Sequence, residues 1–168
     1  CTVTPYDGID NGSPVSTSVT IANRRPTTET VTISPDPSYT ADTMTCAWPG
    51  FSDEDGDPDL STVAWTLDGA TVGTSVTLSG VFVGGDVVLC TVTPFDGKDE
   101  GVPMVAAISI SNTPPTITTA TITPADPYRS EALSCSWTGF ADVDGDPDES
   151  TVQWLVNGTP VSTSMSLP

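Results

Sequence analysis

The sequence repeats itself after 89 residues, and this internal copy constrains the fold more than any other feature. "CTVTPYDG" begins at Cys1 and "CTVTPFDG" at Cys90, while "CAWPGFSDEDGDPD" begins at Cys46 and "CSWTGFADVDGDPD" at Cys135. No gap is needed to align the copies, and about half of the aligned residues are identical. Such a period predicts a modular protein in which each copy is one structural unit.

The period divides the 168 residues into three parts. We expect residues 1–22 to be the C-terminal strands of a first repeat, residues 23–111 a complete repeat, and residues 112–168 the N-terminal strands of a further, truncated repeat. "SNTPPTI" (111–117) marks a joint, because its paired prolines stiffen a short extended linker, and "ANRRPTT" (22–28) occupies the equivalent position. The chain is therefore expected to be a window on a longer tandem array.

Short segments of alternating apolar and polar residues, separated by Gly, Pro and Asp, predict strands and no helix within the complete repeat. The alternation places Met44, Cys46, Trp65 and Cys90 on inward strand faces. The expected fold class is all-β, with tandem β-sandwich repeats of 89 residues. The predicted strands lie near residues 29–34, 43–48, 61–67, 75–78, 86–93 and 104–111.

Cys46 and Cys90 are 44 residues apart on these inward faces. A disulfide between them would contribute about 4 kcal/mol on the chain-entropy model, whereas two buried free thiols would look the same in the sequence. An acidic, Ser/Thr-rich repeat favours the disulfide and therefore a location outside the reducing cytosol. Cys1 and Cys135 hold equivalent positions, so we expect their partners outside this window or in a neighbouring subunit.

These residues resemble an immunoglobulin-like sandwich, in which two cysteines bridge the sheets over a tryptophan on the third strand. "DEDGDPDLSTVAW" is also similar to the D-x-D-G-D and tryptophan pattern of polycystic-kidney-disease-type and related repeats in bacterial and archaeal surface proteins. Two departures stand out: Val88 replaces the tyrosine of the immunoglobulin fold, and "WTLDG" and "WLVNG" replace the W-D-F-G-D-G signature. The resemblance implies tandem immunoglobulin-like repeats at the cell surface or outside the cell, without assigning a subfamily.

The chain carries 22 acidic residues against Arg24, Arg25, Lys98 and Arg129, which gives a formal net charge of −18. This charge would repel nucleic acid and anionic membrane surfaces, and no apolar run approaches the ~20 residues of a membrane span. Histidine and the G-x-S-x-G motif are absent, and the acids repeat with the scaffold, so we expect no enzyme. The acidic excess serves solubility, or cations belong to the working structure.

Aspartates occupy alternate positions in two equivalent loops, "FSDEDGDPDL" (51–60) and "FADVDGDPDE" (140–149). The spacing differs from an EF-hand, because glycine stands at the fourth place of the loop instead of the sixth. In an immunoglobulin-like sandwich the first loop shares one end with "PFDGKDEGV" (94–102), so the acids of both would converge near the preceding repeat. Such a site, similar to the calcium-stiffened joints of cadherin-type arrays, would bind Ca²⁺ through oxygen ligands; a solvated acidic turn is the alternative. The candidate ligands are Asp53, Asp55, Asp57, Asp59, Asp96, Asp99 and Glu100, with Asp142, Asp144, Asp146 and Asp148 in the second loop.

We expect a structural protein, a stalk, adhesin shaft or filament stiffened by disulfides and Ca²⁺. Its partners would be neighbouring repeats or identical subunits that exchange strands, with surface glycan as a further option. Asn11 and Asn157 match the N-glycosylation pattern, but a proline follows each triplet and disfavours the modification. The alternative function is a carbohydrate- or ligand-binding accessory module of a secreted protein, although Trp48 and Trp137 are expected in the core.

Overall fold

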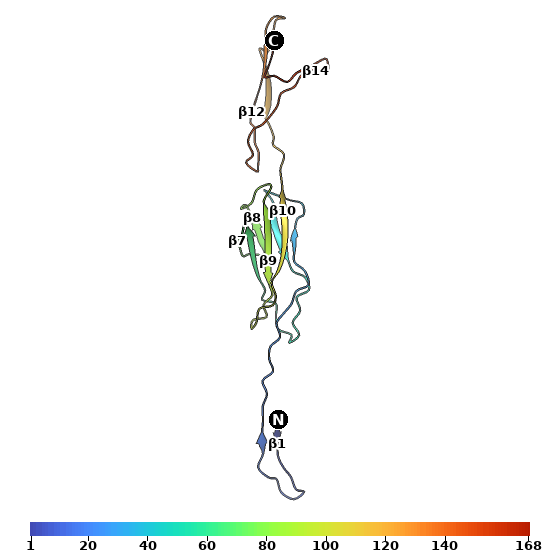
Figure 1. Ribbon diagram of the computed structural model, residues 1–168, viewed down its shortest axis with the longest axis vertical. Helices are drawn as coiled ribbons and strands as arrows, with labels where there is room; N and C mark the ends of the chain where they lie inside the picture. The colour runs from blue at the N-terminus through green and yellow to red at the C-terminus, as the bar shows by residue number, and fades with distance from the viewer.

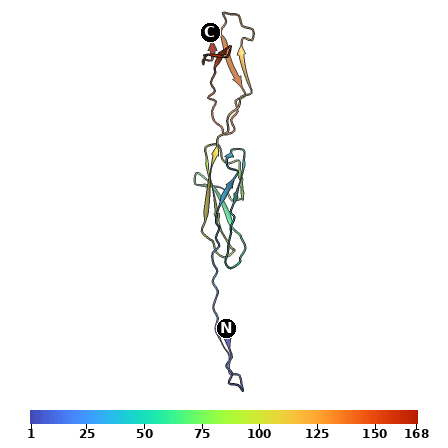
Figure 2. The ribbon, with the colours of Figure 1, turned by 90° about the vertical axis from the view of Figure 1, so that its right-hand side faces the viewer.

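The computed structural model describes all 168 residues, which form strands and turns with no helix. Figure 1 shows a long, narrow molecule whose parts follow one another along its long axis, and the view in Figure 2 has the same outline. The N-terminal segment (1–22), the central unit (23–111) and the C-terminal unit (112–168) appear in that order. The predicted all-β fold class is confirmed.

The central unit is a sandwich of two sheets. Its strands are β3 (Thr32–Ser34), β4 (Ser38–Tyr39), β5 (Thr43–Ala47), β6 (Thr62–Leu67), β7 (Ala70–Gly73), β8 (Thr77–Ser79), β9 (Val87–Thr93) and β10 (Met104–Ser111). One sheet has the order β3-β5-β8 and the other the order β4-β10-β9-β6-β7. Strands β4 and β10 pair in parallel, and the other neighbours are antiparallel. This arrangement is that of an immunoglobulin-like sandwich.

Four of the predicted strands coincide closely with β5, β6, β9 and β10, whereas the predicted segment 29–34 is a strand only from Thr32. Strand β4 was not predicted, because two residues are too few to show alternation. Strand β7, which begins directly after a tight turn at Asp68 and Gly69, was not predicted either. Both residues have positive φ, 51° and 80°, as a two-residue hairpin turn requires.

A disulfide joins the two sheets through the middle of the core. Cys46 on β5 and Cys90 on β9 are bridged, with their Cα atoms 6.4 Å apart. Trp65 on β6 is fully buried, and its indole N–H donates to the carbonyl of Ser75 at 2.8 Å, which satisfies its one polar atom. The predicted bridge and inward faces are confirmed. The core contains Met44, Cys46, Val63, Trp65, Leu78, Phe82, Val88, Cys90, Val92, Ile108 and Ile110.

The C-terminal unit has the counterparts of five of these eight strands but none of β4, β9 and β10. Trp154 lies 89 residues after Trp65 and donates to a backbone carbonyl in the same way, at 2.8 Å. Cys135 is half-buried, whereas its counterpart Cys46 is buried, because the C-terminal unit has no counterpart of β9 to cover it. The strands are β11 (Thr119–Thr123), β12 (Leu133–Thr138), β13 (Trp154–Val156), β14 (Thr159–Ser162) and β15 (Ser166–Leu167), with sheet orders β11-β12-β15 and β13-β14.

The N-terminal segment is an antiparallel hairpin of β1 (Thr2–Val3) and β2 (Val15–Ser16), and an extended stretch of chain leads from it to the central unit (Figure 1). All of its residues are exposed. Cys1 and Cys135 are free thiols, so their pairing with cysteines elsewhere stays a prediction.

Replacing both bridged cysteines, C46A/C90A, should lower the free energy of unfolding by up to about 4 kcal/mol, because a 44-residue loop is no longer closed in the unfolded chain. Denaturant unfolding followed by tryptophan fluorescence measures the change. The matched control C1A/C135A removes two unpaired thiols and should leave the midpoint in place. Equal midpoints for C46A/C90A and the control would contradict this account of the core.

Candidate metal centre

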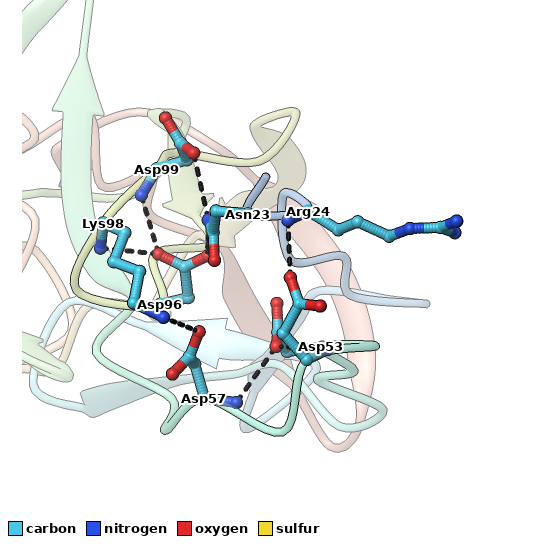
Figure 3. A network of polar contacts seen from close by, with 8 residues as sticks. Asn23, Arg24, Asp53, Asp57, Asp96, Lys98 and Asp99 are labelled. Atoms are coloured by element: carbon cyan, nitrogen blue, oxygen red, sulfur yellow. Dashed lines mark hydrogen bonds and ion pairs between the residues drawn. The ribbon is translucent and has the colours of Figure 1, made fainter. Parts of the chain in front are cut away.

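Two loops of the central unit meet the incoming chain at one end of the sandwich. Residues 48–61 connect β5 to β6, and residues 94–103 connect β9 to β10. The loops are joined by the N–H of Leu60, which donates to the carbonyl of Phe95 at 2.8 Å. The incoming chain packs so tightly on the second loop that a Cβ on Gly101 would lie 2.1 Å from the Pro26 carbonyl oxygen. Figure 3 shows the acidic side chains that this packing brings together.

Asp53 organises the first loop. Its Oδ1 accepts hydrogen bonds from the N–H groups of Asp55 at 2.9 Å and Asp57 at 3.0 Å, which bends the chain into an Asx turn. Consequently, one carboxylate oxygen from each of these three aspartates lies within 4.8 Å of the other two. The second oxygen of Asp53, Oδ2, is buried and has no hydrogen-bond partner.

Asp96 is the deepest acid of the site, with 2 % of its surface exposed. Its Oδ1 accepts the N–H groups of Lys98 at 2.6 Å and Asp99 at 2.7 Å. Its Oδ2 accepts the amide of Asn23 at 2.8 Å, and the same amide donates to Asp99 at 3.0 Å. Asn23 therefore ties the incoming chain to the second loop, while its own Oδ1 is buried without a partner.

Hydrogen bonds keep Asp96 ionised. Burial alone would raise the pKa of this carboxyl, but the hydrogen bonds from the Asn23 amide and from the backbone of Asp99 and Lys98 bring the pKa below its usual range. Asp7, which lies 89 residues before Asp96 in the N-terminal hairpin, forms the same turn: its Oδ1 accepts the N–H groups of Ile9 at 2.9 Å and Asp10 at 2.8 Å. The turn is thus a property of the local sequence.

One cation faces this group of acids. Lys98 Nζ lies 2.6 Å from Asp57 Oδ2, and this hydrogen bond is the main reason why the pKa of Lys98 is raised. Arg24 pairs with Glu54 on the exposed surface, where an ion pair contributes about 0–1 kcal/mol. A single ammonium leaves most of the negative charge of the site uncompensated.

Two predicted ligands lie apart from the cluster. The carboxylate of Asp59 accepts the indole N–H of Trp48 at 3.0 Å and the backbone N–H of Ser61 at 2.9 Å, so its oxygens are directed along the loop. Glu100 is exposed, and its carboxylate takes part in none of these contacts. The structure thus gathers Asp53, Asp55, Asp57, Asp96 and Asp99 around the incoming chain.

The second acidic loop repeats the internal hydrogen bonds without forming the cluster. Asp142 Oδ1 accepts the N–H groups of Asp144 at 2.9 Å and Asp146 at 3.1 Å, and its Oδ2 is likewise buried without a partner. Asp148 accepts the indole N–H of Trp137 at 2.9 Å. Asp144 differs from its counterpart Asp55, because its carboxylate is directed to the central unit.

The sequence predicted that the two loops lie together, but not that Asn23 and Lys98 belong to the site. An asparagine stands at position 23 and again at 112, inside each proline-containing joint, and this recurrence was the available signal for the first. Lys98 is one of only four basic residues and lies among the acids of its loop, which was the signal for the second.

No protein-family model matches the chain, and no curated protein sequence matches it. The resemblance to polycystic-kidney-disease-type repeats therefore stays a prediction. Among the elements of the structure there is no helix with the length and apolar character of a membrane span.

The two Trp–Asp pairs predict a pH dependence. Hydrogen bonds from Ser150 and Trp137 lower the pKa of Asp148. Burial acts to raise the pKa of Asp59, but the hydrogen bonds from Ser61 and Trp48 outweigh it and the pKa is lowered. Their stabilising effect is present above the unfolded value of about 3.9 and is lost as the pH falls through the lower folded value.

An NMR titration should therefore move the indole N–H signals of Trp48 and Trp137 with midpoints below about 3.9. The indole signals of Trp65 and Trp154, which donate to backbone carbonyls, are the control and should not follow this transition. Midpoints at or above the ordinary aspartate value would contradict the assigned hydrogen bonds.

Proposed function

We propose that this chain is part of an extended spacer of a secreted or surface protein, in which successive immunoglobulin-like repeats are stiffened by a disulfide and by bound Ca²⁺. The observation that carries the proposal is the end-to-end arrangement of the units with an acidic cluster at the end where the chain enters (Figures 1 and 3). A spacer needs length and stiffness, and stacking one module repeatedly supplies both.

The donor set at the cluster fits a hard divalent cation. The atoms that the cluster offers to a metal are all oxygens, and calcium takes six to eight oxygen ligands. Two of the oxygens, Asp53 Oδ2 and Asn23 Oδ1, are buried without a partner, a situation that costs about 1–3 kcal/mol per group when nothing satisfies it. Asp55, Asp57 and Asp96 would complete the ligands from this chain.

Electrostatics favours the same conclusion. Two carboxylates about 4 Å apart repel by roughly 1 kcal/mol in water and roughly 4 kcal/mol near a protein surface. The ligand atoms of Asp53, Asp55 and Asp57 lie within 4.8 Å of one another, and Lys98 neutralises only one of them. A bound divalent cation would turn this repulsion into a link between the two loops.

The disulfide supports the proposed location and the mechanical role. Disulfides persist in oxidising compartments, which is compatible with a secreted or surface protein. The core of the central unit holds only 11 buried residues, so a covalent bridge and a cation would add stability that a small core cannot supply. Neighbouring repeats or identical subunits would be the partners.

Carbohydrate binding is the alternative function, and the exposed rings of Tyr6 and Tyr128 favour it. Trp65, Phe82 and Trp154 are buried and offer no surface for stacking on a sugar. A polysaccharide pull-down tests this alternative, while electron microscopy of the native protein tests the spacer. Unbranched rods support the spacer, and compact particles that bind a polysaccharide support the alternative.

Calcium should raise the melting temperature of the chain. At a free concentration of 100 Kd the stabilisation is about 2.7 kcal/mol, or roughly 11–22 °C for a unit of this size. Differential scanning calorimetry in chelator and after addition of CaCl₂ measures the shift.

The variant D53N should lose this shift, because it removes a charged ligand from the cluster. D142N is the matched control, since it makes the same change in the loop that lacks the cluster, and it should keep the shift. An unchanged melting temperature in calcium, or equal behaviour of the two variants, would reject the proposed site.

A further inference from the structure

One carboxylate connects the central unit, the linker and the C-terminal unit. Asp144 Oδ1 accepts hydrogen bonds from the N–H of Gly84, at 2.9 Å, and from the hydroxyl of Thr40. Its Oδ2 accepts the N–H of Thr113, in the linker, at 2.5 Å. The Thr40 hydroxyl and the Thr113 N–H lower the pKa of Asp144, and the acceptor is therefore charged at neutral pH.

Both donors on the central unit lie in braced turns. Thr40 follows β4 in a turn that is closed by two hydrogen bonds between Tyr39 and Asp42, of 2.8 and 2.9 Å. The loop that carries Gly84 is tied to Ile110, near the end of β10, by two backbone hydrogen bonds of 2.9 and 2.8 Å. Strand β10 pairs with β4 and leads directly into the linker, so both donors are tied to the strand from which the linker starts.

The close approach of Asp144 depends on a glycine. A Cβ on Gly84 would lie 2.8 Å from Asp144 Cγ and 3.0 Å from Asn112 Cα. Any side chain at position 84 would therefore push the acidic loop away from this end of the central unit. The contact is one of fitted surfaces as well as hydrogen bonds.

Asp55 makes half of the same contact. It lies 89 residues before Asp144, and its Oδ2 accepts the N–H of Arg24 at 2.6 Å, as Asp144 accepts that of Thr113. The rest of its carboxylate is exposed at the opposite end of the central unit from Thr40 and Gly84. One unit thus carries the acceptor at one end and the donors at the other.

We propose that the Asp144 carboxylate fixes the orientation of one unit on the next, and we call its contacts with Thr40, Gly84 and Thr113 the latch. The surface around Asp55 would form the same contacts with Thr40 and Gly84 of another copy of this unit that precedes it. Because the two halves of the contact differ, it is heterologous, and such a contact can repeat from one unit to the next. The inference rests on the proposed spacer function for its purpose, and in a unit that follows another it assigns Asp55 to the joint, which leaves Asp53, Asp57, Asp96 and Asn23 to hold the cation of that unit.

Residual dipolar couplings of the full 168-residue chain, recorded in chelator, test the latch. In the wild type the central and C-terminal units should share one alignment tensor, because a rigid joint orients them together. D144A should abolish this common tensor and reduce the degree of order of the C-terminal unit. G84A should do the same without touching the carboxylate, and T40V should loosen the joint by removing one donor.

D55A is the matched control, because it changes the same loop position where no preceding unit is present. Its two units should keep the common tensor, and amide shifts within each unit show that every variant is folded. A common tensor retained in both D144A and G84A, or an equal loss in D55A, would overturn the latch. Loss of calcium binding alone would leave this result unchanged, so the two proposals fail separately.

A chain in which residues 23–111 are duplicated in tandem tests the surface around Asp55. The Asp55 of the second copy then follows a complete unit and should contact Thr40 and Gly84 of the first copy. Its replacement by Ala should therefore abolish the common alignment tensor of the two copies. The same substitution in the first copy should stay silent. Equal effects in both copies, or none in either, would overturn the assignment of this surface.

Discussion

The disulfide between the two sheets is the constraint on which the rest of the structure depends. It fixes β5 against β9 over the buried indole of Trp65, and these two strands lead into the two acidic loops. Since both loops begin from strands that are covalently joined, they meet at the same end of the sandwich. The aspartates are close together because the core requires it, despite the repulsion between their charges.

The two acidic loops show how two similar sequences give two local outcomes. Asp53 and Asp142 shape their loops with equivalent hydrogen bonds, and each keeps one buried oxygen unpaired. The difference arises at the next aspartate, which lies in the cluster at position 55 and against the central unit at position 144. The presence of a folded unit before the loop therefore decides whether this carboxylate lies among the other aspartates of its loop or against the preceding unit.

Much of this arrangement could be predicted from the sequence, because its causes are periodic. Alternation identified the strands that bury Met44, Cys46 and Cys90, and the 89-residue shift identified the joints. The two-residue strand β4 and the hairpin at Asp68 escaped prediction, since they depend on pairing and backbone conformation. The separation of Asp59 from the cluster also could not be foreseen, because it follows from a hydrogen bond to the half-buried Trp48.

A crystal structure of the chain grown in CaCl₂ would test the central claim most directly. The account predicts an anomalous peak between the two loops, with oxygens of Asp53, Asp55, Asp57, Asp96 and Asn23 at about 2.3–2.6 Å from the ion. It also predicts that Lys98 leaves Asp57 when the cation enters. A cluster that contains only water, with the Lys98–Asp57 pair unchanged at saturating calcium, would contradict the account.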